Sequence, residues 1–182
     1  MKVITHISTR AGRGKNLTLV WGVHDFAGGK LLVALSAEGI CWIGINCGEA
    51  DLAKNWAGAN LIQDQKMTEK AAREIASAWK KGWPQNADAI KQPLVLYGTA
   101  FQIKVWKELL KIKSGKTLTY ADIARKVGAP TAVRAVGSAV GKNTLSLIVP
   151  CHRVVNTSGN KISYAWGPAV KKALLKAEGV AV

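Results

Sequence analysis

The sequence predicts a small α/β domain over residues 1–88 and a mostly α-helical domain over residues 89–182. Two observations predict this two-part fold. The stretch 80–93, KKGWPQNADAIKQP, is rich in turn-forming residues and interrupts the hydrophobic periodicity. Before it, β-branched and aromatic residues occur in strand-like runs, whereas after it apolar residues recur at helical spacing.

The first segment is expected to pair strands and then form helices. Residues 16–26 and 30–46 are rich in β-branched and aromatic side chains, and a Gly-Gly pair separates them. Helices are expected to follow at about 50–57 and 68–81. No pattern in this segment indicates catalysis, so we expect it to be a scaffold. The expected ends of the second helix are Thr68 as its N-cap and Gly82 as its stop.

The second segment is expected to contain short capped helices. Residues 99–102 (TAFQ) and 119–122 (TYAD) have the spacing of a capping box, so each predicts a helix start. Gly128 then allows a turn, and Pro130 suits the first turn of another helix. Two short helices joined through a glycine turn are typical of a helix-turn-helix.

The second helix of this pair has two unlike faces at 3.6 residues per turn. Its expected core face consists of Ala132, Val133, Val136, Ala139 and Val140. Its outer face consists of Thr131, Arg134, Ala135, Ser138 and Lys142. An Ala-rich helix of high propensity would explain the small residues. Small side chains also let a helix approach another surface closely, and the basic surroundings favour that interpretation.

The charge of the chain is strongly positive and unevenly distributed. Lys and Arg number 26 against 11 Asp and Glu, which gives a net charge of +15. Residues 89–182 hold 15 of the basic residues but only 3 of the acidic ones. This imbalance favours a polyanionic partner, most often nucleic acid. A generically basic protein and a membrane-surface binder are the alternatives.

Membrane insertion and secretion are not expected. No run approaches the roughly 18 uncharged apolar residues of a spanning helix, and the first residues lack the apolar core of a signal peptide. The three cysteines form no even disulfide framework, which indicates a reducing compartment. Cys41 and Cys47 have a spacing unusual for zinc, so we expect buried thiols and no metal.

The octet IVPCHRVV, residues 148–155, places Cys151 directly beside His152 and Arg153. A structural cysteine in a buried strand is one interpretation, because free cysteine behaves as a small core residue. The other is a nucleophile next to its base, since a thiol reacts as the thiolate. The octet alone does not decide between them.

Four motifs together resemble the O6-alkylguanine-DNA alkyltransferase family: RAVGSAVGKN, IVPCHRVV, SYAWG and KKALLKAEG. The resemblance runs from about residue 98 to Glu178, and the SYAWG variant is most similar to the bacterial adaptive-response methyltransferases. It implies a ribonuclease-H-like α/β N-terminal domain and a winged-helix-like (helix-turn-helix) C-terminal domain. It also implies a protein used once for DNA repair, with no cofactor.

The resemblance implies roles for five residues in the chemistry. Cys151 accepts the alkyl group from guanine O6, and transfer from thymine O4 to the same thiol is also expected. His152 acts as base through a bridging water, and Glu178 orients it. Tyr120 protonates the departing guanine, and Asn143 braces the turn at the site. Arg153 is expected to have a structural role.

The resemblance also implies how DNA and the target base are held. The partner is double-stranded DNA with an alkylated guanine, approached through the minor groove, with Arg134 filling the gap left by the flipped base. Further DNA contacts are expected from Tyr120, Thr131, Ala135, Gly137 and Ser138. The base pocket is expected to consist of Val154, Tyr164, Ala165 and Trp166. The Trp166 indole is expected to narrow this pocket and to favour methyl over benzyl adducts.

We expect the protein to be a monomer. We expect it in the cytoplasm, associated with the nucleoid, or in the nucleus of a eukaryote. Three other functions compete with repair. A damage sensor of the same family would bind the alkylated base without removing the group, but such proteins lack the cysteine. A helix-turn-helix regulator would prefer one DNA sequence. A thiol hydrolase would need an oxyanion loop, which is not evident.

Overall fold

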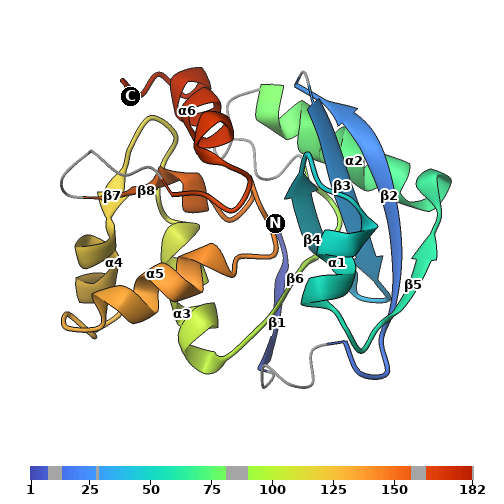
Figure 1. Cartoon of the computed structure of the whole chain (residues 1–182), viewed down its shortest axis with the longest axis horizontal. Coiled ribbons are helices and arrows are strands. Elements are labelled where there is room, and N and C mark those ends of the chain that lie inside the picture. Colours follow the sequence, from blue (N-terminus) through green and yellow to red (C-terminus); the bar gives the residue numbers. More distant parts are fainter. Residues whose placement is uncertain (8–13, 28, 81–89, 157–162, 182) are drawn as a thin grey trace.

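The computed structural model describes residues 1–7, 14–27, 29–80, 90–156 and 163–181. A twisted sheet with helices against it forms one side of the molecule, and a group of helices forms the other (Figure 1). The strands are β1 (Val3–Ile7), β2 (Thr18–Phe26), β3 (Gly29–Ser36), β4 (Gly39–Ile45), β5 (Asn60–Gln63), β6 (Leu94–Gly98), β7 (Leu118–Thr119) and β8 (Val154–Val155). The helices are α1 (Glu49–Asn55), α2 (Gln65–Lys80), α3 (Ala100–Leu109), α4 (Tyr120–Lys126), α5 (Val133–Gly141), the 3₁₀ turn η3 (Cys151–Arg153) and α6 (Pro168–Ala177).

The large sheet has the strand order β1-β6-β4-β3-β2-β5. Strands β2, β3 and β4 are antiparallel neighbours, whereas β1 and β6, and β2 and β5, run parallel. The predicted pairing of residues 16–26 with the next run is confirmed. The prediction for 30–46 was incomplete, because a turn divides that run into β3 and β4. Gly39 follows this turn with φ of +143°, and a Cβ there would lie 2.2 Å from the Pro93 carbonyl oxygen.

Strand β6 lies beyond the predicted boundary at residues 88 and 89, yet it pairs with β1 and meets β4 within the sheet. The second segment therefore supplies an inner strand to the scaffold. The boundary itself stays a prediction.

The two faces of the sheet bury two separate clusters of apolar residues. Alternate residues of β3 point to opposite faces, so Leu32 joins the cluster that includes α1, and Leu31 joins the cluster that includes α2. The second cluster continues into the helical half, where it includes Trp106 and Cys151. Because one core spans the sheet and the helices, elements of both halves can position the same site.

Helix α2 begins earlier than predicted. Thr68 is not its N-cap: it is fully buried within the helix and donates to backbone carbonyls of Asp64 and Gln65. The Asp64 carboxylate accepts from the Met67 N–H at 2.9 Å, as a capping side chain does. Asp and Thr are both favoured at the N-cap position. Because Thr68 is buried within the helix, the Asp64 side chain is the one that caps it. Gly82, the expected stop, lies outside the described residues.

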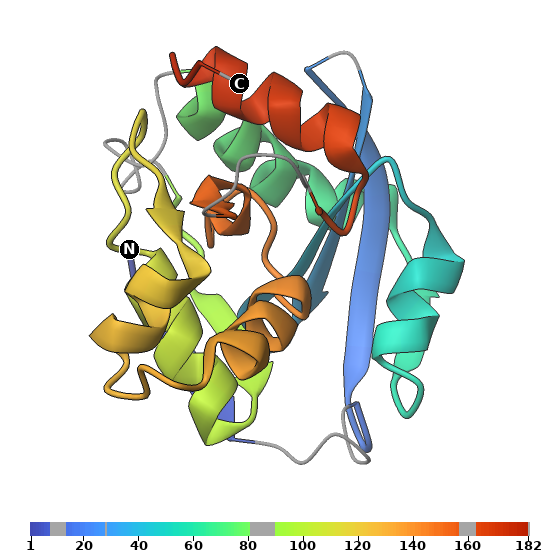
Figure 2. The same cartoon turned by 60° about the vertical axis from the view of Figure 1, so that its left-hand side comes forward.

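The helical half follows the predicted caps. Both capping boxes are present, with Thr99 starting α3 and Thr119 starting α4. Gly128 adopts φ of +69° in the turn after α4. Pro130 lies in this turn rather than in the first turn of α5, and Val133, expected in the core, is 37% exposed. Figure 2 shows α4 and α5 packed together beside α3.

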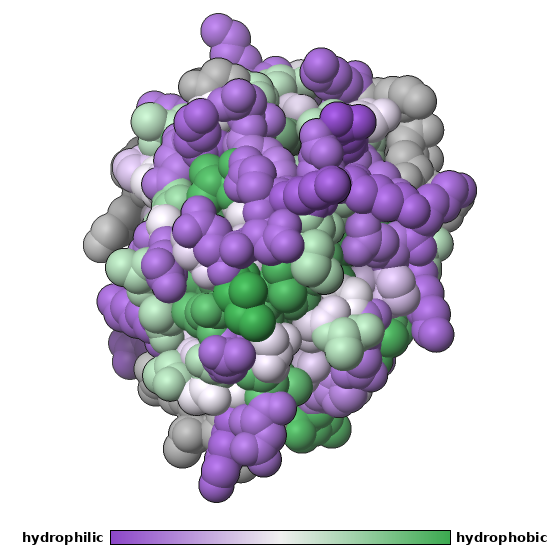
Figure 3. Space-filling view, turned by 90° about the vertical axis from the view of Figure 1, so that its right-hand side faces the viewer, coloured by the Kyte–Doolittle hydropathy of each residue, from purple (hydrophilic) through white to green (hydrophobic). Residues whose placement is uncertain are grey.

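The right-hand side of the molecule in Figure 1 carries β2, β5 and α2. Figure 3 shows this side, on which apolar side chains gather between hydrophilic ones. Ile62 of β5 and Met67 of α2 are large apolar residues with substantial exposure. None of the described helices combines the length and the apolar character needed to cross a membrane.

Candidate active site

Cys151 begins the 3₁₀ turn η3 and lines a small cavity formed by residues of the second half of the chain. It is 6% exposed, and its N–H donates to the Val149 carbonyl at 2.8 Å. The chain reaches it through a buried turn in which Leu147 adopts a left-handed φ of +70°. The cavity has a volume of about 70 Å³ and is lined by Tyr120, Gly137, Val140, Gly141, Asn143, Ser146, Cys151, Ser163, Tyr164 and Ala165.

Asn143 braces the turn that carries Cys151. Its amide nitrogen donates to the Val149 carbonyl at 2.8 Å and to the Cys151 sulfur at 3.1 Å. Its amide oxygen accepts from the Leu145 N–H at 3.0 Å. One buried side chain therefore fixes both the backbone of the turn and the position of the thiol.

His152, Arg153 and Glu178 form a buried network next to the thiol. The His152 Nε2 atom lies 3.0 Å from Glu178 Oε1. Arg153 donates to both carboxylate oxygens, at 2.8 Å from Nε and at 2.6 Å from Nη2, and to the Ile112 carbonyl at 2.5 Å. His152 and Arg153 are fully buried, and the Glu178 side chain is 4% exposed. The network fixes the imidazole and leaves its other nitrogen, Nδ1, buried without a protein partner.

Burial and hydrogen bonds shift the pKa values of Cys151, His152 and Glu178. Burial raises the pKa of Cys151, while the Asn143 hydrogen bond opposes that rise. Burial lowers the pKa of His152, although Glu178 acts in the other direction. Burial alone would raise the pKa of Glu178, but hydrogen bonds from His152 and Arg153 lower it. At neutral pH the site therefore holds a thiol, a neutral imidazole and a carboxylate that can stabilise the imidazolium.

Tyrosines stand on two sides of the cavity. Tyr120, at the start of α4, is half-buried, and burial together with the negative charge of a Cys151 thiolate raises its pKa. Gly137 of α5 faces it, since a Cβ there would contact the Tyr120 ring at 3.9 Å. The Tyr164 hydroxyl is buried, and burial followed by the Cys151 charge raises its pKa well above the usual range. Both phenols are therefore protonated at neutral pH.

Two residues expected in the base pocket lie elsewhere. Trp166 does not line the cavity: its indole donates to Ser146 Oγ at 2.6 Å and packs edge-on against Trp42, with ring centroids 6.1 Å apart. Gly44 leaves room for it, because a Cβ there would lie 3.1 Å from the Trp166 ring. Trp166 is therefore one residue removed from the cavity lining, next to Ala165, and its effect on the size of the pocket stays a prediction. The Val154 side chain is buried, and its carbonyl accepts a 2.6 Å hydrogen bond from Lys171.

The predicted outer face of α5 is exposed except at Lys142, which is half-buried. Arg134, Ala135 and Ser138 are exposed on it, and Thr131 is exposed in the preceding turn. Gly137, which was grouped with this face, is half-buried at the cavity. The exposed face and the cavity mouth thus belong to the same helix.

Lys171 is a site residue that the sequence analysis missed. It is 2% exposed, and its ammonium donates to the carbonyls of Val154, at 2.6 Å, and Ser163, at 3.4 Å. Burial lowers its pKa, and the nearby Cys151 charge opposes that change. A signal was present, because Lys171 lies seven residues before Glu178 and three before Leu174, on the same helical face.

Cys41 and Cys47 are free thiols away from the site. Burial raises the pKa of both, that of Cys47 to about 12. Within the described ranges, no group of three or more His, Cys, Asp or Glu side chains is arranged to hold a metal ion.

Known proteins are similar to this chain in sequence and in fold, and a family model matches its second half. A family model described as the DNA-binding domain of 6-O-methylguanine DNA methyltransferase matches residues 100–180. An inducible methylated-DNA–protein-cysteine methyltransferase of Bacillus subtilis is 34% identical over 166 residues, covering 88% of this chain and 90% of the relative. The chain belongs to the methylated-DNA–protein-cysteine methyltransferase family.

Other comparisons within this family agree. The bifunctional transcriptional activator and DNA repair enzyme Ada of Escherichia coli K12 is 36% identical over 169 residues, 91% of this chain and 47% of Ada. The chain thus spans about half the length of that relative. A crystal structure of a Mycobacterium tuberculosis O6-methylguanine methyltransferase has a TM-score of 0.71 and 31% identity, covering 88% of this chain and 92% of that one. A crystal structure of M. tuberculosis OGT in complex with DNA has a TM-score of 0.69 and 30% identity, with the same coverage.

Proposed function

We propose that this methyltransferase repairs DNA directly, by moving an alkyl group, mainly methyl, from guanine O6 to Cys151. Transfer from thymine O4 is part of the same proposal. The observation that carries it is a buried thiol held by Asn143 beside the His152–Glu178–Arg153 network. The test is incubation with duplex DNA that carries labelled O6-methylguanine, followed by peptide mass mapping. One methyl per protein on Cys151 supports the proposal, and label elsewhere refutes it.

The proposed reaction uses four side chains: Cys151, His152, Glu178 and Tyr120. His152 Nδ1 takes the proton of the Cys151 thiol through one water molecule, and Glu178 stabilises the resulting imidazolium. The thiolate then attacks the alkyl carbon: a bond from sulfur to carbon forms, and the bond from carbon to O6 breaks. The Tyr120 hydroxyl donates a proton to the guanine ring, which receives the electron pair. The imidazolium proton returns to Tyr120 through solvent, and the thioether remains because no group in the site removes it.

The buried position of the thiol requires the target base to leave the DNA stack. A base inside a duplex cannot reach an atom at the floor of a cavity. The exposed face of α5, with Thr131, Ala135 and Ser138 beside Arg134, supports approach to the minor groove, where small side chains allow close contact. The M. tuberculosis OGT–DNA complex supports DNA as the partner.

Arg134→Ala is expected to slow transfer from duplex DNA by about 10- to 100-fold, because Arg134 would no longer offset the few kcal/mol of unstacking. Transfer from the free base O6-methylguanine, which needs no flipping, should change little. Single-turnover rates on the two substrates measure the difference. Arg73→Ala, which removes an exposed arginine from α2, is the matched control. Equal losses on both substrates would contradict the role.

Trp166→Gly is expected to raise the ratio of benzyl to methyl transfer rates at least about tenfold. The indole ties residues 163–167 to Ser146 and Trp42, and so limits how far Tyr164 and Ala165 can move for a bulky adduct. Parallel assays with O6-benzyl- and O6-methylguanine measure the ratio. Trp166→Phe keeps the aromatic contact and should stay near the parent value. An unchanged ratio in the glycine variant would show that other residues set adduct size.

The architecture is a mixed α/β fold with a sheet and helices. We infer that its first half is a ribonuclease-H-like scaffold and that α4 and α5 belong to a winged-helix-like unit. The protein is proposed to act as a monomer on chromosomal DNA, in the bacterial nucleoid or the nucleus. A damage sensor that binds without transfer is disfavoured, because Cys151 is present and positioned by Asn143.

A further inference from the structure

We propose that Trp79, on helix α2 of the scaffold half, is a positioning residue that separates the catalytic base His152 from a solvent-filled hollow. This inference rests on the proposed function in assigning His152 its role. It gives the first half of the chain a part in the chemistry, which the sequence analysis did not expect.

The Trp79 ring lies between an open hollow and the buried imidazole. Its centroid is 6.3 Å from that of His152, with the ring planes at 72°, and 6.2 Å from that of Phe26. Phe26 and Trp79 both line two adjoining hollows of about 540 and 340 Å³, between α2, the β2–β3 turn and α6. His152 lines neither hollow and is fully buried.

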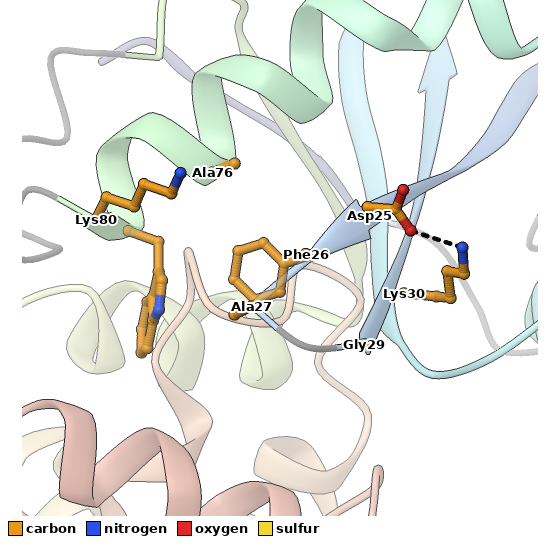
Figure 4. A pocket seen from close by; sticks show the side chains of 8 residues that line it. Asp25, Phe26, Ala27, Gly29, Lys30, Ala76 and Lys80 are labelled. Atoms are coloured by element: carbon orange, nitrogen blue, oxygen red, sulfur yellow. Dashed lines mark hydrogen bonds and ion pairs between the residues drawn. The ribbon is translucent and has the colours of Figure 1, made fainter.

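The hollow is open to water on its outer side. Figure 4 shows the Phe26 ring pointing into it, with Lys80 and Ala76 of α2 on one side and the Asp25–Lys30 ion pair on the other. The side chains of that ion pair are 90% and 61% exposed. Water can therefore reach the outer face of Trp79, and the indole is the ring between that water and the imidazole.

Exclusion of water matters because burial is the main cause of the low pKa of His152. The titratable groups that act on the imidazole are Glu178 after α6, Lys171 on α6 and Arg153 on η3. From α2 it is contacted by the uncharged indole. A hydrated imidazole beside Glu178 would hold its proton to higher pH and would lose its capacity to act as base under mildly acidic conditions.

The test is the pH profile of Cys151 methylation. The parent protein should keep its rate to a pH below the ordinary histidine pKa of about 6.5, because burial lowers the pKa of His152 and keeps the base neutral there. In Trp79→Ala the acid limb should move up by about one pH unit, with less than about a threefold rate change on the alkaline plateau. Trp79→Leu, a smaller cavity change, should shift it less, and Trp79→Phe least. Lys80→Ala, on the same hollow, is the control without a shift.

The NMR titration of the His152 ring gives a second readout that does not depend on alkyl transfer. A higher His152 pKa in Trp79→Ala, with a normal thermal unfolding curve, supports the separating role. An unchanged titration, or a rate loss equal at every pH, overturns it. If the parent protein failed to alkylate Cys151, the proposed function would fall while this titration still tested the role of Trp79.

Discussion

Cys151→Ala is expected to abolish alkyl transfer, with a loss on the order of 10⁶-fold, as for other enzymes that lose their nucleophile. In the proposed reaction the Cys151 thiol forms the new bond, and no other thiol is among the described residues that line the cavity. Affinity for duplex DNA should remain, because the exposed face of α5 is untouched. The measurements are label transfer from O6-methylguanine duplexes and DNA binding at fixed salt.

Cys47→Ala provides the matched control for this experiment. Cys47 is half-buried, and its pKa of about 12 keeps it a thiol at neutral pH. This variant should transfer one methyl per protein at the parent rate. Repair by Cys151→Ala, or several lesions repaired by one parent molecule, would contradict the proposed stoichiometric mechanism.

Glu178→Gln is expected to lower both stability and rate. The neutral amide keeps the shape of the side chain but removes the charge that balances the buried Arg153 guanidinium. Breaking a buried pair in this way costs about 3–5 kcal/mol in the free energy of unfolding. The transfer rate should fall by about 10²- to 10⁴-fold, because the imidazolium loses its carboxylate. Urea unfolding and single-turnover kinetics measure the two effects.

Glu69→Gln supplies the comparison for an exposed ion pair. Glu69 pairs with Arg73 on the surface of α2 at 2.6 Å, so its loss should cost no more than about 0.5 kcal/mol. If Glu178→Gln unfolded at the same urea concentration as this variant, the buried network would not carry the stability assigned to it.

Local signals in the sequence predicted where α3 and α4 begin. The capping boxes at Thr99 and Thr119 place side-chain acceptors next to backbone N–H groups of the same turn, so their effect needs no distant contact. The pairing of β2 with β3 likewise follows from neighbouring runs and a glycine turn. Motif spacing alone also indicated that Cys151, His152 and Glu178 belong together.

Contacts between elements that are distant in sequence could not be predicted from such local patterns. Trp166 follows Tyr164 and Ala165 closely in sequence, yet it packs on Trp42 of β4 rather than lining the cavity. Thr68 resembled an N-cap but is buried under the sheet. Strand β6 completes the scaffold although a long stretch of chain separates it from β1.

The sequence by itself indicated the family, because four motifs within about 80 residues carry the resemblance, and that resemblance implied Cys151 as the nucleophile and His152 as its base. Only the tertiary structure placed Lys171 against the strand of Val154 and Trp79 against His152. Those contacts form because the two halves share one core. Burial between surfaces that are distant in sequence produces no periodic or local pattern in either segment, so it could not be predicted from the sequence.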